Sequence, residues 1–553
     1  MEDLRIFSLG GLDVNGKNLY VIEIDQNIYV VECGIGYPGS GSYLGVDFSI
    51  PDFTYLIENK DRVKGIFISH AHDDVMNALP FLLKEADFPV YATTLTAKLL
   101  EASFEKSGIR GKKVNIISRK QSFTVDGRKI RSFPLSQSIA DGIGLAFETS
   151  MGYIVYTSDF LFDYETTHKG FDIDVTELAD IGKEGVFVWM SESSGVFNEG
   201  YTSPNHKITS LIEPYIEKSG SRIIITLYQQ NLYRTIEILD LAIKYRKRVF
   251  FQNDYNLNIL KAVESLGYYS FPASLLVRKA DFDNNDEDII VIVSGGGKKV
   301  FETMNAIATG ADRTISLRTS DQIIIASPVV AGGEKSAGEM EDNLYRLGCS
   351  IRKINSKEVL SMHASIEDIR MMMYLLKPNY YLPTSGEYRY LLENANIALS
   401  MNYRPDKIIL LDNGQVAYFH DGKIKSTKQV ITLNESLIGG RDMIDSGSTI
   451  ITDRKTLSTD GIIVVGVLLD FKSKELIGGP DAQSRGVIYL KDSDYILENV
   501  AKILLESISE AVEGGYYDNM QVRTVARDRI SRYIAKETGK HPMILPSIVE
   551  INI

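Results

Sequence analysis

The sequence predicts an α/β protein with more than one domain, and three observations lead to this prediction. The apolar run Ile66–Ile68 is typical of a buried strand, and the apolar spacing over 77–85 is typical of a helix that follows it. Between residues 205 and 350, helical patterns alternate with strands, as in a parallel, doubly wound sheet. At 553 residues the chain exceeds what one core usually serves, so we expect two or three domains.

The composition is typical of a soluble globular protein. Hydrophobic residues at 44% and charged residues at 24% are ordinary for a soluble globular protein. The net charge of −13 argues against nucleic-acid binding by bulk electrostatics, although it leaves room for a local basic channel. The two cysteines, Cys33 and Cys349, suit a reducing compartment, and the first residues lack the pattern of a signal peptide. Because no apolar run reaches about 18 residues, we expect a cytoplasmic protein.

The polar cluster His70-x-His72-x-Asp74 follows the strand Ile66–Ile68 directly. Open α/β sheets place ligands at the carboxyl ends of their strands, and two imidazoles with a carboxylate can share one metal ion. Asp159 also follows a predicted buried strand, 153–158. The alternative is structural: the histidines hydrogen-bond to backbone groups in a polar turn, and Asp159 forms a turn.

Two further segments carry candidate residues. Ser294–Lys299 is a glycine-rich loop between a strand and a helix, so its amides can cradle a phosphate, although by itself a tight turn is the preferred explanation of the glycines. His363 lies just before a predicted helix, Ile366–Leu376, for which Ser365 and Asp368 form a capping box. Alone, His363 is more typical of a residue satisfied by local hydrogen bonds. The segment 523–532 is also rich in arginine. A solvated face or a contact with a protein partner is the preferred interpretation of these arginines, and RNA contact is the alternative.

These motifs together resemble the ribonuclease J family of bacterial β-CASP nucleases. His70-x-His72-x-Asp74 is similar to its His-x-His-x-Asp-His signature, and the segments 45–53, 191–194, 383–389 and 541–546 are similar to further family motifs. The resemblance implies a metallo-β-lactamase αββα sandwich with an inserted doubly wound β-CASP domain and a small α+β C-terminal domain. It divides the chain into the two parts of the lactamase domain, 1–204 and 351–436, the β-CASP domain, 205–350, a linker, 437–455, and the C-terminal domain, 456–553.

The resemblance also implies a damaged metal centre. In the family, five histidines and two aspartates hold two ions; here His70, His72, Asp74 and Asp159 remain, while three histidine places are occupied by Val75, Gln137 and Ser385. A four-ligand zinc site is worth on the order of 10–16 kcal/mol, so each lost ligand weakens binding by about two decades. We therefore expect either no bound metal or weakly bound zinc or manganese.

Residues that contact RNA follow from the same resemblance. The family has a His-Val-Ser-Gly-His-Ala segment that contacts an RNA phosphate; here Val359 and Met362 replace its first histidine and its glycine. The expected residual catalytic residues are Asp74 and His363. The expected substrate-binding residues are Ser361, Met362, His363, Asn231 and Arg234.

Our leading hypothesis is a weak or inactive ribonuclease J-like subunit that acts in bacterial RNA processing and mRNA decay together with an active ribonuclease J paralogue. Bacteria with two paralogues often carry one with a degraded site, which this sequence resembles. The alternative is a metal-dependent RNase with residual 5′-to-3′ exonuclease or endonuclease activity of its own, and a third hypothesis is an RNA-binding module without a nuclease partner. A homodimer also agrees with the resemblance. The sequence determines neither the stoichiometry nor the RNA targets.

Overall fold

A computed structural model describes residues 2–37, 45–166, 168–330, 332–440, 442–445, 449–487 and 494–552. The chain forms two compact units: one comprises Met1–Ser40 and Asp47–Ile438, and the other comprises Gly41–Val46 and Gly439–Ile553. Among the described residues, no helix is both long and apolar enough to span a membrane.

The first unit contains two large sheets, which form its lactamase-like domain. The eight-stranded sheet has the order β20-β19-β1-β2-β3-β5-β6-β7, and the six-stranded sheet has the order β18-β12-β11-β10-β9-β8. The strands of the eight-stranded sheet are β1 (Asp3–Gly10), β2 (Leu19–Ile24), β3 (Asn27–Val31), β5 (Val63–Ile68), β6 (Val90–Ala92), β7 (Asn115–Ile116), β19 (Gln415–His420) and β20 (Lys423–Val430). Those of the six-stranded sheet are β8 (Gln121–Val125), β9 (Arg128–Pro134), β10 (Ile143–Thr149), β11 (Gly152–Thr157), β12 (Val186–Ser191) and β18 (Tyr380–Pro383).

Three apolar layers hold these sheets in a sandwich. Side chains such as Ile6, Tyr29, Leu145 and Tyr156 pack between the sheets. Helices cover both outer faces, with their apolar sides turned inward. On the eight-stranded sheet these helices are α1 (Thr54–Glu58), α2 (Asp73–Met76), α3 (Leu79–Glu85) and α4 (Thr94–Lys106); on the other they are α5 (Val175–Glu184), α11 (Ile366–Leu376) and α12 (Tyr388–Ser400). The predicted αββα sandwich is confirmed, as is the capping box of α11.

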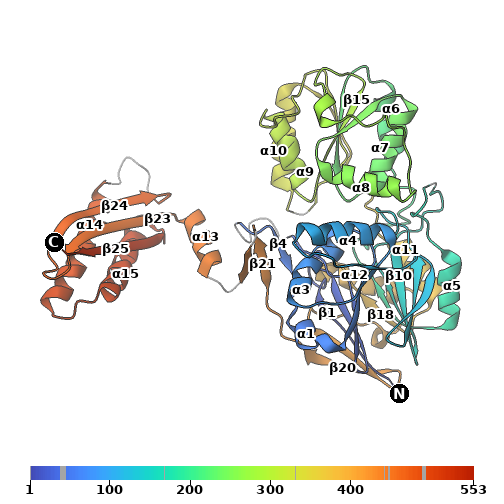
Figure 1. The fold of residues 1–553 in the computed structure, drawn as a ribbon, viewed down its shortest axis with the longest axis horizontal. Coiled ribbons are helices and arrows are strands. Elements are labelled where there is room, and N and C mark those ends of the chain that lie inside the picture. The colour runs from blue at the N-terminus through green and yellow to red at the C-terminus, as the bar shows by residue number, and fades with distance from the viewer. Residues whose placement is uncertain are drawn as a thin grey trace. The chain divides into compact units, whose positions relative to one another are not determined.

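The inserted domain contains a five-stranded sheet in the order β14-β15-β13-β16-β17, and every strand pair is parallel. Helices α6 to α8 pack on one face and helices α9 and α10 on the other (Figure 1), which confirms the doubly wound prediction. The strands are β13 (Ile223–Tyr228), β14 (Arg248–Phe251), β15 (Ile289–Gly295), β16 (Gln322–Ile325) and β17 (Ser350–Lys353). The helices are α6 (Thr209–Glu217), α7 (Leu232–Lys244), α8 (Asp254–Ser265), α9 (Lys299–Ala308) and α10 (Glu334–Leu347).

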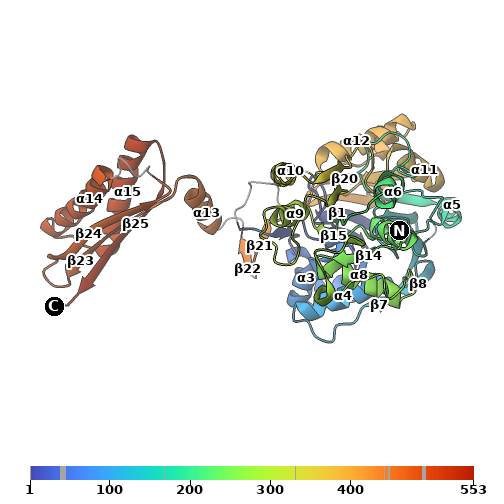
Figure 2. The ribbon, with the colours of Figure 1, turned by 90° about the horizontal axis from the view of Figure 1, so that it is seen from above.

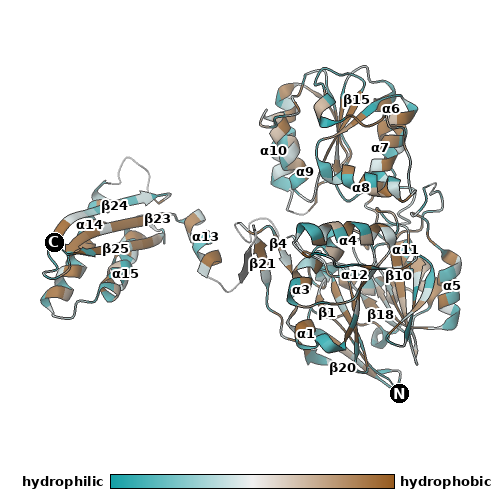
Figure 3. Ribbon diagram, viewed as in Figure 1, coloured by the Kyte–Doolittle hydropathy of each residue, from teal (hydrophilic) through white to brown (hydrophobic). Residues whose placement is uncertain are grey.

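The second unit is a small α+β domain. Its sheet has the order β24-β23-β25, and two long helices pack on one face of it (Figure 2). Figure 3 shows the hydrophobic colouring of the central strand β23. The elements are β23 (Ile462–Asp470), β24 (Leu476–Arg485), β25 (Met543–Ile551), α14 (Asp494–Glu513) and α15 (Asn519–Thr538).

Two sequence predictions concern the segments next to and within this unit. The predicted linker, 437–455, includes most of β21 (Ser436–Gly439), which pairs with β4 (Phe48–Ile50), all of β22 (Asp442–Asp445), and the start of α13 (Thr449–Thr459). The sequence pattern predicts a strand over 486–490, but β24 ends at Arg485, and residues 488–490 lie outside the described residues. The sequence pattern missed β24 because its glycines and polar residues hide the alternation of a strand.

One buried ion pair joins the starts of β13 and β16 in the inserted sheet. The Arg222 guanidinium donates to both carboxylate oxygens of Asp321, at 3.0 and 2.6 Å, and both side chains are fully buried. Removing one partner of such a pair leaves a buried charge without its counter-charge.

We therefore expect Asp321→Ala to destabilise the inserted domain by about 3–5 kcal/mol, measured as a shift in the midpoint of urea unfolding followed by circular dichroism. Glu213→Ala, which removes a partner of the exposed Lys244, is the matched control and should leave the midpoint unchanged. Equal shifts in both variants would contradict the assignment.

Candidate functional site

The candidate site lies where strands of both sheets end. His70 and His72 follow β5, Asp159 follows β11, Glu192 follows β12 and Ser385 follows β18. Strands β11, β12 and β18 are parallel neighbours, so their carboxyl ends share an edge. The structure brings His70, His72 and Asp159 together at this place.

A glycine lets the histidine loop pack closely against the first sheet. A Cβ atom on Gly34 would lie 1.6 Å from the carbonyl oxygen of Asp74, so no other residue fits there without moving the loop. The Cys33 amide donates to the Val75 carbonyl in the same contact. The position of the loop is therefore fixed by backbone packing as well as by side chains.

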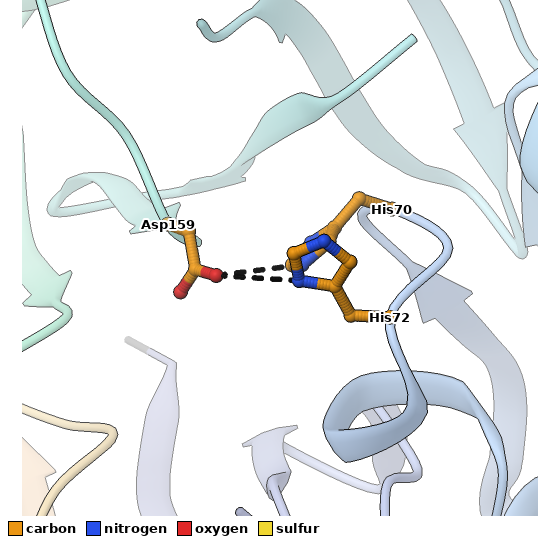
Figure 4. A group of neighbouring side chains, drawn as sticks. All are labelled: His70, His72 and Asp159. Atoms are coloured by element: carbon orange, nitrogen blue, oxygen red, sulfur yellow. Dashed lines mark ion pairs between the residues drawn. The ribbon is translucent and has the colours of Figure 1, made fainter. Parts of the chain in front are cut away.

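His70, His72 and Asp159 converge on one point (Figure 4). Nε2 of His70 and Nδ1 of His72 each lie 3.6 Å from the same oxygen, Oδ2 of Asp159. Ligands about 2.0–2.1 Å from a tetrahedral ion lie roughly 3.4 Å apart, which is close to this spacing. In addition, Nε2 of His70 is buried and makes no hydrogen bond within the described residues. These three donors fit a single ion.

The outer nitrogens of both imidazoles are held by serines. Ser69 Oγ lies 2.8 Å from Nδ1 of His70, and Ser138 Oγ lies 2.9 Å from Nε2 of His72. Such partners orient a ligating histidine and fix which nitrogen faces the ion. Glu32 supports this arrangement, because its carboxylate accepts the amide of Ser69 at 3.1 Å.

The second ion position of the family does not fit the residues present. The Asp74 carboxylate accepts a hydrogen bond from the side-chain amide of Asn18 at 3.1 Å, and Val75 is a buried apolar side chain. Ser385 Oγ lies 2.9 Å from the Tyr20 hydroxyl, which also accepts the Ser385 amide. One carboxylate and a hydrogen-bonded hydroxyl pair do not replace the imidazoles that hold such an ion.

The third vacated histidine place, Gln137, is fully buried, and neither end of its amide makes a hydrogen bond within the described residues. Unpaired buried amides are unusual, because each end costs free energy when it is removed from water without a partner. Gln137 thus places an amide where the imidazole nitrogen that zinc prefers is expected.

His363 and Glu192 form a second polar pair beside Asp159. Nδ1 of His363 lies 2.8 Å from Oε2 of Glu192 and 3.6 Å from Oδ1 of Asp159. Burial by itself would lower the pKa of His363, but the two carboxylates raise that pKa well above its ordinary value. Burial raises the pKa of Glu192 to about 7. The pair therefore holds a proton at neutral pH.

Burial and neighbouring groups shift the pKa values of three further residues in the site. Burial lowers the pKa of His70 to about 4, so its imidazole is neutral and able to bind a metal ion. Burial and the charge of Asp159 raise the pKa of Asp74 to about 6. Burial also opposes ionisation of Asp159, but the surrounding imidazoles outweigh it and hold the pKa of Asp159 well below its ordinary value.

The predicted substrate-binding residues are divided between the site and its border. Only His363 lies among the site residues; Ser361 is exposed and Met362 is buried. Asn231 caps helix α7 by accepting the amide of Arg234 at 2.9 Å. Arg234 is only 4% exposed and donates to the carbonyls of His206 and Leu360, so it joins the two segments that enter and leave the inserted domain. Contact of these residues with RNA stays a prediction.

Several residues in or near the site were not predicted from the sequence to belong to it. Glu192 could have been found, because it follows a buried strand in the same way as Asp159. Ser69 and Ser138 had no such signal, since serines in turns are common. Asp163 also escaped notice; it is buried and accepts hydrogen bonds from Ser203 and from Tyr233 of the inserted domain.

Comparison with known proteins agrees with this architecture. Three family models match consecutive parts of the chain: a β-lactamase superfamily domain over residues 45–180, the β-CASP domain of ribonuclease J over 220–344, and the ribonuclease J C-terminal domain over 449–551. Among solved structures, a protein of unknown function from Enterococcus faecalis V583 matches with a TM-score of 0.51 at 15% identity, covering 75% of this chain and 100% of its own. That likeness concerns the fold alone.

Full-length relatives extend the match to the whole chain. Ribonuclease J 2 of Staphylococcus aureus strain NCTC 8325 is 30% identical over 557 residues, which is 100% of this chain and 99% of the relative. Ribonuclease J2 of Bacillus subtilis strain 168 is 31% identical over 553 residues, with the same coverage. Because three family models match consecutive parts of the chain and the relatives match it over its full length, the chain belongs to the ribonuclease J family.

Proposed function

We propose that this protein is a ribonuclease J-like subunit of bacterial RNA processing and mRNA decay that is weak or inactive alone and acts in complex with an active ribonuclease J paralogue. The observation that carries this proposal is the donor set. One ion position keeps His70, His72 and Asp159, whereas the other keeps Asp74 and loses both imidazoles to Val75 and Ser385. Phosphodiester cleavage by two ions needs both positions.

The surviving residues still have defined tasks. His70, His72 and Asp159 would hold one zinc or manganese ion, which supplies a hydroxide nucleophile at neutral pH when bound. His363 holds a proton at Nδ1 against Glu192, and this pair is placed to hydrogen-bond a phosphate oxygen beside Asp159. Asn18 occupies an oxygen of Asp74 that a second ion would need. The site is therefore suited to bind a phosphate better than to cleave it.

An alternative remains for direct test: a metal-dependent RNase with residual 5′-to-3′ exonuclease or endonuclease activity. The 3.6 Å convergence of His70 and His72 on Asp159 favours it, because the geometry is already that of an ion site. The two proposals share RNA as the bound molecule and the cytoplasm as the compartment. They differ in whether this chain or its partner cuts.

One prediction from the proposed function concerns the affinity for metal. We expect Gln137→His to raise the affinity for Zn²⁺ about 100-fold, because it returns a third imidazole to the position of His70 and His72, and His72→Ala to lower it by a similar factor. Titration with a competing chelator measures both. Gln137→Leu, which adds no ligand, is the control. An affinity unchanged by Gln137→His would contradict the assignment of this pocket.

The second prediction concerns activity. On 5′-monophosphorylated RNA with Mn²⁺ or Zn²⁺, we expect the protein alone to be at least about 100-fold slower than an active ribonuclease J, as the loss of ligands requires. Any residual rate should disappear in His72→Ala and in Asp74→Ala. A rate near that of the active enzyme would overturn the leading proposal, and a rate unchanged by both substitutions would show contamination.

The third prediction concerns the partner. Mixed with an active ribonuclease J from a bacterium that carries both paralogues, the protein should elute with it as one complex in size-exclusion chromatography with light scattering. The complex should keep its nuclease activity when His72 of this chain is replaced by alanine, because the partner's site does the cutting. Separate elution at micromolar concentrations would contradict the proposed complex.

A further inference from the structure

An exposed aromatic side chain lies beside the site without a role in it. Phe197 is 55% exposed, on the segment that follows Glu192. Its ring packs edge-on against Tyr390, with ring centroids 5.0 Å apart and an angle of 74° between the rings. The guanidinium of Arg389 lies 5.1 Å from the centroid of Tyr390. We call these three side chains the aromatic platform.

The aromatic platform is built on the same backbone as the site. A Cβ atom on Gly195 would lie 2.3 Å from the carbonyl oxygen of Ala364 and 3.2 Å from that of His363, so the Phe197 segment packs directly on the His363 segment. The Asn198 carbonyl then accepts the amide of Ile366 at 3.1 Å. Phe197 is thus held next to His363 by main-chain contacts.

The other half of the aromatic platform is equally fixed. Tyr390 and Arg389 lie in the first turn of α12, three to five residues after Ser385 and Gly386. A Cβ atom on Gly386 would lie 3.2 Å from Cβ of Tyr390 and 3.5 Å from Cβ of Ser193. Further along α12, the Asn394 amide donates to the Glu192 carbonyl at 2.8 Å. Both halves therefore rest on the strand ends that carry the polar residues.

From this placement we infer that the aromatic platform binds an unpaired base of an RNA strand whose phosphate lies at His363. The inference rests on the proposed function. Aromatic rings stack on any base, and a guanidinium can either stack or contact a phosphate. Stacking also suits a chain with a net charge of −13, because it adds affinity that a cationic surface would otherwise supply. The charge of Arg389 is shared with Glu387, at 2.9 Å, which leaves the rings as the main contribution.

The test measures binding of a fluorescein-labelled single-stranded RNA of about 12 nucleotides, in EDTA, by fluorescence anisotropy at several salt concentrations. We expect Phe197→Ala to weaken binding about 5- to 150-fold, the range found for loss of one stacked base. The slope of affinity against salt should not change, because no charge is lost. Phe197→Trp should restore binding, whereas Phe197→Leu, which keeps apolar volume without a π face, should not.

Tyr374→Ala is the matched control, since this tyrosine is 66% exposed on α11 and belongs to no part of the site. If the wild type binds RNA and the variants Phe197→Ala and Tyr374→Ala bind it with the same affinity as each other, the inference is overturned while the proposed function stays intact. Absence of RNA binding by the wild type would overturn both. Loss of the complex with an active ribonuclease J in Phe197→Ala, with RNA binding unchanged, would assign the aromatic platform to a protein partner and also overturn the inference.

Discussion

The carboxylate of Asp159 is the group on which the site depends. One oxygen faces His70 and His72 from the first sheet, and the other faces His363 from the segment that returns from the inserted domain. A single side chain therefore joins three parts of the chain that are distant in sequence. Because the surrounding imidazoles favour its ionised form, Asp159 keeps a negative charge in a buried place, and the site is poised for a cation even though several ligands are gone.

The two ion positions expected from the family motifs differ in how the residues around them are paired. Around His70 and His72, the orienting serines remain and one donor nitrogen still lacks a partner, so that position keeps its geometry. Around Asp74, neighbouring polar groups have paired with one another. The fold tolerates both outcomes, because the three apolar layers of the sandwich consist of side chains other than the ligands. Loss of metal binding therefore need not cost the chain its structure.

The sequence could predict features that depend on a short stretch of residues, but not contacts between residues far apart in the chain. The layered fold was predictable from periodicity and from the family motifs, and His70 with Asp159 from their places at strand ends. The pairing of His363 with Glu192 joins residues 171 positions apart, so no local pattern reveals it. Arg234 looks like an exposed cation in sequence, yet the fold buries it against two carbonyl groups. Phe197 gives no signal at all, because its exposure depends on where the loop packs.

The inserted domain contacts the site region through two hydrogen bonds of Tyr233. The amide of Tyr233, at the start of α7, donates to the Ser138 carbonyl at 2.9 Å, and the hydroxyl of the same serine orients His72. Asp163, four residues after the central carboxylate, bonds the Tyr233 hydroxyl at 3.2 Å. A shift of α7 would therefore move the partner of one imidazole and strain the strand end that carries Asp159. Because hydrogen-bonded partners of this kind orient a ligating imidazole, the inserted domain contributes to the geometry of the candidate ion position without supplying one of its three donors.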